Sequence, residues 1–144
     1  KKLFKYDFKM KKVYIAGPLF DDHERDYLEK IATSLEAIGY QTFLPHRDAG
    51  LVEGEFTEIK KSEIFDIDMN ALNDADIVVA LLTGRDVDSG TAAEVGIAYT
   101  QGKRLIGINA NNIKVINNFV WGLFDYGNSI INGVEDLESV LNEK

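Results

Sequence analysis

The sequence feature that most constrains the fold is an uninterrupted apolar run from Ile77 to Leu82, which reads Ile-Val-Val-Ala-Leu-Leu. A strand with one face in water alternates apolar and polar residues, and this run does not alternate. Strands of this kind are typical of parallel sheets that are covered by helices on both faces. The run therefore predicts a central strand of a parallel sheet.

Strand and helix patterns alternate along the rest of the chain. Further strands are predicted at residues 13–17, 41–44, 104–108 and 129–131, and helices at residues 22–38, 57–72, 91–101, 119–124 and 134–141. Such alternation is typical of an α/β fold. We expect a flavodoxin-like three-layer sandwich with a five-stranded parallel sheet, in which the loops after the first and third strands meet at the sheet edge. Residues 17–20 would then lie beside residues 86–94.

Three segments carry more local expectations. Residues 46–54 combine mixed charge with two glycines and read as a long loop. In residues 91–101 the first turns carry small side chains that would let the helix approach the sheet closely, at Ala92, Ala93 and Gly96. In residues 57–72 an approximate apolar face is formed by Ile59, Ile64, Ile67, Ala71 and Leu72.

Length and composition fit one domain. The chain has 144 residues, of which 45% are hydrophobic, enough for a single core. We expect the domain to cover residues 10–144, because Met10 opens a more conventional start than the basic, aromatic residues 1–9, an N-terminal extension to which no function is assigned.

The charge argues against several classes of partner. A formal net charge of −8 disfavours a nucleic-acid-binding protein, since phosphate neutralisation needs a basic face. No apolar run approaches the length of a membrane span, no stretch resembles a signal peptide, and there are no cysteines. We therefore expect a cytoplasmic protein that binds small molecules, with no nucleic acid and no membrane as partner.

Several common chemistries lack their sequence signatures. The nearest candidate for a phosphate-binding loop, residues 102–104, has neither the upstream glycine nor the following hydroxyl. His23 and His46 are the two histidines, are not spaced as zinc ligands and are expected at surface or loop positions. Ser89 does not lie in a Gly-x-Ser-x-Gly elbow. We expect no metal and no cofactor, which leaves carboxylate chemistry.

Two carboxylates lie at the predicted loop-to-helix junction of residues 88–96. Glu94 has two interpretations there. With Thr91 it fits a Thr-x-x-Glu capping box, in which Glu only satisfies a backbone N–H. The same helix end would also hold Glu94 ionised, as a carboxylate nucleophile requires. The junction alone favours the capping interpretation.

Three segments taken together carry a family resemblance. Residues 14–20 (Tyr-Ile-Ala-Gly-Pro-Leu-Phe), the aspartate-rich residues 66–76 and the junction at residues 88–96 resemble, in order and spacing, the nucleoside 2-deoxyribosyltransferase family. The resemblance spans most of residues 13–131. It implies a flavodoxin-like fold and a transferase of nucleotide salvage that exchanges the base of a 2'-deoxyribonucleoside for a free nucleobase through a covalent deoxyribosyl-enzyme.

The resemblance also implies roles for individual residues. Glu94 matches the family's nucleophile, and Asp68 matches the aspartate that protonates the departing base. Asp88 matches an aspartate that holds the sugar 5'-hydroxyl, and Tyr14 a tyrosine near the nucleophile. Asn118 matches a sugar-binding asparagine that a neighbouring subunit supplies, which implies a homo-oligomer. These matches favour catalysis over capping for Glu94.

Each of these partners also has a purely structural interpretation. Asp68 could be a solvated helix residue, and Tyr14 could pack within its strand. Asn118 could cap the helix that begins at Phe119. The occurrence of all the matches in order favours the functional interpretation.

Other residues are expected to contact the substrate. Gly17, Phe20 and Gly90 belong to the two loops predicted to meet at the sheet edge, and they complete the expected substrate site. Phe20, Phe43 and Trp121 could stack on a base or belong to the core, and for large aromatic residues the core is the more common place.

The implied chemistry explains why carboxylates are needed. Cleavage of an N-glycosidic bond passes through an oxocarbenium-like state, which an ionised carboxylate stabilises and captures while a second carboxyl carries the proton of the base. The two groups need opposite protonation states. We expect the helix end to keep Glu94 charged and an apolar, carboxylate-rich pocket to raise the pKa of Asp68.

Two alternatives remain open on the sequence. One is an N-glycosidase of 2'-deoxynucleoside 5'-monophosphates, which would use the same nucleophile. Asp88 favours nucleosides over nucleotides as substrates, because a carboxylate accepts a hydrogen bond from a 5'-hydroxyl but repels a phosphate. The other is a non-catalytic nucleoside-binding module on the same fold.

Overall fold

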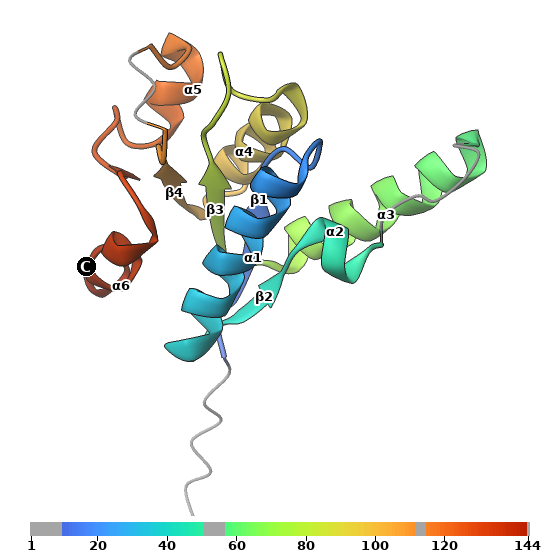
Figure 1. The fold of residues 1–144 in the computed structure, drawn as a ribbon, viewed down its shortest axis with the longest axis horizontal. Helices are drawn as coiled ribbons and strands as arrows, with labels where there is room; N and C mark the ends of the chain where they lie inside the picture. Colours follow the sequence, from blue (N-terminus) through green and yellow to red (C-terminus); the bar gives the residue numbers. More distant parts are fainter. Residues whose placement is uncertain (1–9, 51–56, 112–114, 144) are drawn as a thin grey trace, which may run out of the picture.

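The computed structural model describes residues 10–50, 57–111 and 115–143 of the chain. Its centre is a five-stranded sheet, in which all neighbouring strands run parallel in the order β2-β1-β3-β4-β5 (Figure 1). The strands are β1 (Lys12–Ala16), β2 (Gln41–Phe43), β3 (Ile77–Leu81), β4 (Arg104–Ile108) and β5 (Ile130–Ile131). The predicted fold class, strand number and strand direction are confirmed.

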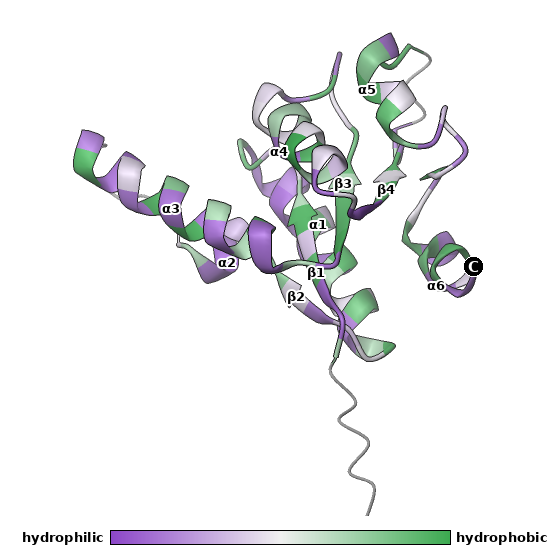
Figure 2. Cartoon of the chain, turned by 180° about the vertical axis from the view of Figure 1, so that it is seen from behind, coloured by the Kyte–Doolittle hydropathy of each residue, from purple (hydrophilic) through white to green (hydrophobic). Residues whose placement is uncertain are grey.

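Helices cover both faces of this sheet. One face packs on α1 (Asp22–Ala37) and on α6 (Leu137–Asn142), which a short 3-10 turn at Val134–Asp136 precedes. The other face packs on α3 (Glu58–Asp74), α4 (Ser89–Thr100) and α5 (Asn118–Leu123). Alternate residues of β3 enter opposite layers: Val79 belongs to the first cluster and Val78 to the second, and both are fully buried. Figure 2 shows β3 coloured as hydrophobic.

The first helix has the ends that its sequence predicts. Asp21 caps α1 by accepting from the Glu24 N–H, and the Glu24 side chain bonds back to the Asp21 N–H. Gly39 follows the last turn with a φ of +98°, a left-handed conformation that favours glycine. The first signal fixes the start of α1, and Gly39 turns the chain from the end of α1 toward β2.

The segment after β2 differs from the predicted loop. Residues Pro45–Asp48 form the short helix α2, with proline at its first position and the Asp48 carboxylate accepting from the Leu44 N–H at 2.8 Å. His46 is not a surface residue: its side chain is 6% exposed, and Nε2 lies 3.1 Å from a Glu29 carboxylate oxygen. Proline is suited to the first position of a helix because the N–H that it lacks would have no hydrogen-bond partner within the helix there. Of the predicted loop, residues 51–54 lie outside the described residues.

The predicted apolar face of α3 is wrong in part, because Ala71 and Leu72 pack on the sheet but the residues nearer its start do not. Ile59 and Ile67 are 72% and 42% exposed, and Leu72 is the buried residue of this helix. Figure 1 shows the reason: the N-terminal half of α3 projects beyond the sheet, and the C-terminal turns alone cover it. Figure 2 shows hydrophilic and hydrophobic residues mixed along its length.

The prediction for the small residues of α4 is also wrong in part. Thr91, Val95 and Ala98 are the buried residues of this helix. Ala93 is exposed, and a Cβ placed on Gly96 would meet nothing within 4 Å. Ala92 packs beside the buried cluster as predicted, whereas Ala93 and Gly96 point away from the sheet.

Two other expectations concern the ends and the surroundings of the domain. The expected extension, residues 1–9, lies outside the described residues. In the part of the chain that the structure describes, no helix combines the length and the apolarity needed to cross a lipid bilayer.

Candidate active site

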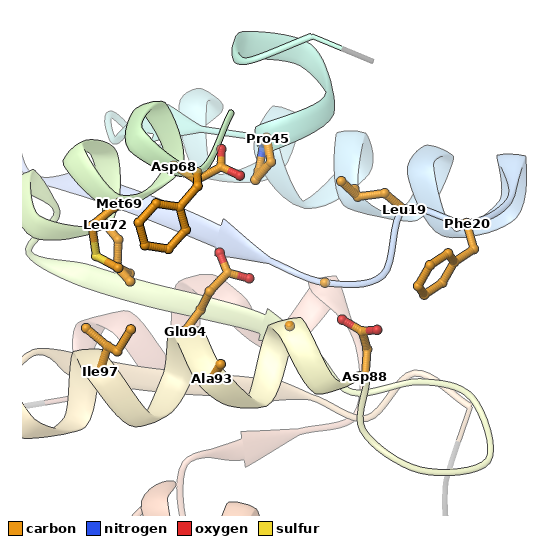
Figure 3. Close-up of a pocket in the computed structure, with 13 residues that line it drawn as sticks. Leu19, Phe20, Pro45, Asp68, Met69, Leu72, Asp88, Ala93, Glu94 and Ile97 are labelled. Carbon is orange, nitrogen blue, oxygen red and sulfur yellow. The ribbon is translucent and has the colours of Figure 1, made fainter. Parts of the chain in front are cut away.

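A pocket of about 400 Å³ lies at the carboxyl ends of β1 and β3 (Figure 3). These strands are neighbours in the sheet, and their following loops diverge to opposite faces, as at the ligand-binding edge of other open parallel sheets. The loop after β1 and the start of α4 both line the pocket, which confirms the predicted meeting of these two segments.

Two helices face each other across this pocket. Each contributes a stripe of residues at positions i, i+3, i+4 and i+7, which is one face of a helix. The stripe of α4 consists of Gly90, Ala93, Glu94 and Ile97, and that of α3 consists of Phe65, Asp68, Met69 and Leu72. Each stripe holds one carboxylate among apolar or small residues, and these two carboxylates are Glu94 and Asp68.

The remaining wall comes from the β1–α1 loop and α2. It consists of Gly17, Leu19, Phe20 and Pro45. Gly17 has a packing role as well, because a Cβ there would lie 2.6 Å from a Leu28 methyl carbon and 3.1 Å from the Leu81 Cβ. The predicted substrate residues Gly17, Phe20 and Gly90 thus all line the pocket.

Tyr14 holds the Glu94 side chain. Tyr14 is fully buried in β1, its ring stacks on Phe43 at 5.5 Å between centroids, and its hydroxyl donates to Glu94 Oε2. Burial raises the pKa of Tyr14, and the Glu94 carboxylate raises it further. Tyr14 therefore keeps its proton and serves as a donor that fixes the position of Glu94.

The environment of Glu94 favours its neutral form. Burial raises the pKa of Glu94 to about 7, and the negative charges of Asp68 and Asp88 act in the same direction, against the bond from Tyr14. The expectation that a helix end keeps Glu94 fully ionised is wrong. Glu94 lies in the second turn of α4, where loss of water outweighs the favourable helix end.

The predicted capping box does not form. The cap of α4 is Asp88, whose Oδ2 accepts from the Thr91 N–H at 3.0 Å and from the Thr91 hydroxyl at 3.1 Å. Because the helix begins at Ser89, Glu94 is too far along it to bond the first backbone N–H groups. The structural role that the sequence suggested for Glu94 belongs to Asp88, which also lines the pocket.

Asp68 faces Glu94 from α3. Burial raises the pKa of Asp68 to about 6. Its Oδ1 atom is buried and has no hydrogen-bond partner among the described residues. A buried oxygen in this state is satisfied by a ligand or by its own proton. The expected rise in the pKa of Asp68 is found, and the interpretation of Asp68 as a solvated residue is wrong.

Asn118 lies away from this pocket. It is the first residue of α5 and lines a separate hollow of about 490 Å³, together with Arg85 and Asp86. The cap of α5 is Asn117, whose side-chain oxygen accepts from the Phe119 and Val120 N–H groups. Asn118 is therefore neither the helix cap nor a residue of its own chain's pocket.

The aromatic candidates separate in the same way. Phe20 lines the pocket and is 81% exposed. Phe43 packs on Tyr14, and Trp121 packs edge-on against Tyr126 at 6.4 Å, so neither of them lines it. The pocket-lining residue Phe65 was missed, although its spacing of three and four residues from Asp68 and Met69 was a usable signal.

The described pocket holds three carboxylates, of Asp68, Asp88 and Glu94, and no lysine or arginine. Among the described residues, no group of three or more histidine, aspartate or glutamate side chains is arranged to hold a metal ion. Two carboxyl groups with pKa values near neutrality can exchange protons at physiological pH, and each can act as acid, base or nucleophile.

Known protein families include one whose model matches most of this chain. The model of the nucleoside 2-deoxyribosyltransferase family matches residues 13–140. The chain belongs to this family. Its members act on N-glycosidic bonds, as transferases or as glycosidases. A search of curated proteins gave no match.

Solved structures share the fold of this 2-deoxyribosyltransferase family member. A 2-deoxyribosyltransferase from the bacterium Bacillus psychrosaccharolyticus has 24% identity and a TM-score of 0.73, over 88% of this chain and 90% of its own. A conserved protein from Enterococcus faecalis has the same identity and TM-score, over 94% and 99%. The CMP N-glycosidase of Clostridium botulinum has 20% identity and a TM-score of 0.61, over 92% and 99%.

Proposed function

We propose that this protein exchanges the base of a 2'-deoxyribonucleoside for a free nucleobase through a covalent deoxyribosyl-Glu94 intermediate. The observation that carries the proposal is the position of Glu94, held by the buried Tyr14 hydroxyl in a pocket that Asp68 enters from the opposite helix. This is the two-carboxyl arrangement that glycosyl transfer with a covalent intermediate requires.

The first half-reaction breaks the N-glycosidic bond. A Glu94 carboxylate oxygen bonds to the anomeric carbon, and the pair of electrons of the broken bond leaves with the base. Asp68 gives its proton to a ring nitrogen of the departing base. In the second half-reaction an incoming base attacks the same carbon, its proton passes to Asp68, and Glu94 is released as the carboxylate.

Both pKa values lie near neutrality, and that of Glu94 lies above that of Asp68, the reverse of the order these roles require; positive charge that develops on the sugar beside Glu94 lowers its pKa. Asp68, with a pKa of about 6, can hold a proton near neutral pH and donate it. Glu94, with a pKa of about 7, gains its charge readily when positive charge develops on the sugar in front of it. Tyr14 stabilises the ionised form of Glu94 by its hydrogen bond. A pocket whose other walls are mostly apolar keeps water from the intermediate.

Asp88 supports nucleosides rather than nucleotides as substrates. Both bonds from Thr91 end on its Oδ2 atom, which leaves Oδ1 for a ligand. A carboxylate there accepts a bond from a 5'-hydroxyl and repels a 5'-phosphate. We further propose that Asn118, which does not line its own chain's pocket, enters the pocket of a second subunit.

The test is a product assay on a substrate panel. We expect the protein to transfer deoxyribose from deoxyadenosine to a second base, and Glu94→Ala to remove this activity and the sugar adduct seen by mass spectrometry. Glu63→Ala, at an exposed position of α3 outside the pocket, is the control and should retain full activity.

Three outcomes would overturn the proposal. Base exchange retained in Glu94→Ala would remove Glu94 from the mechanism. Release of free base from deoxynucleotides alone would identify an N-glycosidase of nucleotides. Binding of nucleosides without any turnover would identify a non-catalytic module.

A further inference from the structure

The pocket has two chemically different ends. From Gly90 to Ile97 the stripe of α4 extends about 10 Å at 1.5 Å per residue, and Glu94 lies between these residues. Figure 3 shows Asp88 and Phe20 toward one end, and Ile97, Leu72 and Met69 toward the other. If a sugar reacts at Glu94 with its 5'-hydroxyl toward Asp88, its base extends toward the second end.

That second end is apolar, and the large side chains of α3 dominate it. Phe65, Met69 and Leu72 share one face of the helix with Asp68. Among the described residues that line this end, Asp68 is the one side chain that can form hydrogen bonds. A base held here has its ring faces covered by hydrocarbon, and its edges meet few donors or acceptors.

Phe65 lies one helical turn before Met69 on the pocket-lining stripe of α3, and it is not buried. Its side chain is 60% exposed, whereas Leu72 on the same stripe is 1% exposed. An exposed aromatic ring beside a pocket loses water when a flat ligand covers it, and this favours binding. Phe20 has the same character but lies toward Asp88, on the sugar side (Figure 3).

We infer that Phe65 is the residue on which the nucleobase stacks, and that this end of the pocket selects bases by the area of their rings rather than by the hydrogen-bonding pattern of their edges. The inference rests on the proposed base exchange for its orientation of the substrate. Stacking on an aromatic ring tolerates many bases because each has a π face, and a two-ring purine covers more of the phenyl group than a pyrimidine.

The experiment compares three variants of the full chain. Phe65→Leu removes the ring and keeps an apolar side chain, Phe65→Tyr keeps the ring, and Ile67→Ala alters an exposed residue of α3 outside the pocket. We expect Phe65→Leu to raise the KM for adenine as acceptor about five- to tenfold and that for cytosine less, with kcat at saturation within about twofold. Phe65→Tyr and Ile67→Ala should resemble the wild type.

Calorimetric titration with free adenine separates this inference from the proposed function. Weaker adenine binding in Phe65→Leu than in Phe65→Tyr supports stacking even if the wild type exchanges no bases. The absence of base exchange in the wild type would overturn the proposed function but not the role of Phe65. Equal adenine affinity in Phe65→Leu and the wild type would overturn the role of Phe65. A loss that is the same for adenine and cytosine would overturn selection by ring area.

Discussion

Glu94 is a carboxylate in surroundings that favour its neutral form. Its folded-state pKa of about 7 lies above its ordinary value of 4.5 because burial removes water from the charged group. The folded protein therefore binds this proton more tightly than the unfolded chain does. The resulting stability is fully present below about pH 4.5 and is lost as the pH rises toward about 7.

Glu94→Gln should consequently stabilise the protein at high pH. The amide keeps an oxygen for the Tyr14 hydroxyl and never ionises. We expect the free energy of unfolding to rise by on the order of 2 kcal/mol at about pH 8 and to change little at about pH 4, measured by urea denaturation. Glu63→Gln, at an exposed carboxylate, is the control, and an equal gain in both variants at pH 8 would contradict the account.

The sequence could identify Glu94 as important but could not identify the residue that caps α4. The pattern Thr-x-x-Glu at residues 91–94 satisfied a capping rule, yet the helix begins at Ser89 and is capped by Asp88. Which residue caps a helix depends on where the chain enters it. That entry is set by packing of the preceding loop, which a local pattern does not contain.

At the scale of elements, two helices divide the site between them. α4 packs on the sheet through Thr91, Val95 and Ala98, and it carries Glu94 at the edge of this buried face, within reach of Tyr14 of β1. α3 is attached to the sheet mainly by its C-terminal turns, and it carries Asp68. At the start of α4, Asp88 has two roles, because it caps the helix and also lines the pocket.

Substitutions at Asp88 should separate its two roles. Asparagine is a good helix cap but carries no charge, whereas alanine is neither a cap nor charged. We expect Asp88→Ala to lower the free energy of unfolding by about 1 kcal/mol and Asp88→Asn by less than half of that, in thermal or urea denaturation. Both should raise the KM for deoxynucleosides, and an unchanged KM in Asp88→Asn would show that the carboxylate has no part in sugar binding.

The strands and the bounds of α3 were predicted well from the sequence, but the buried face of α3 was not. The run from Ile77 is apolar because every residue of β3 is buried between two helical layers, so its sequence alone carries the signal. In α3 the same face packs on the sheet and lines the pocket, and the N-terminal half of the helix mostly makes neither contact. Its apolar residues Ile59 and Ile67 point to solvent, and the helical spacing of Phe65, Met69 and Leu72 does not reveal whether that stripe faces a sheet or a pocket.

At the scale of the whole molecule, one chain does not bring all the expected site residues together. Tyr14, Asp68, Asp88 and Glu94 meet around one pocket, but Asn118 lies at a separate hollow. Phe119, the next residue of α5, is 78% exposed. A large apolar side chain beside a displaced site residue is what a surface covered by a second subunit would present.

Mixing two inactive variants tests this shared site. Glu94→Ala keeps Asn118, and Asn118→Ala keeps Glu94, so a mixed dimer would contain one complete site. We expect each variant alone to be nearly inactive and a refolded equimolar mixture to recover about a quarter of wild-type base exchange. A fully active monomer in sedimentation, or mixed oligomers without recovery, would contradict the role of Asn118.

The separation of the pocket into an end beside Asp88 and an apolar end beside Ile97, Met69 and Leu72 has an evolutionary consequence. The stripe of α3 carries neither the proposed nucleophile Glu94 nor Asp88, the proposed ligand of the 5'-hydroxyl, and much of that helix is not held by the sheet. Side chains on it can be exchanged without disturbing the reacting carbon. In descendants of such a protein, the choice of leaving group can drift from one nucleobase to another in single steps while the sugar chemistry is inherited unchanged.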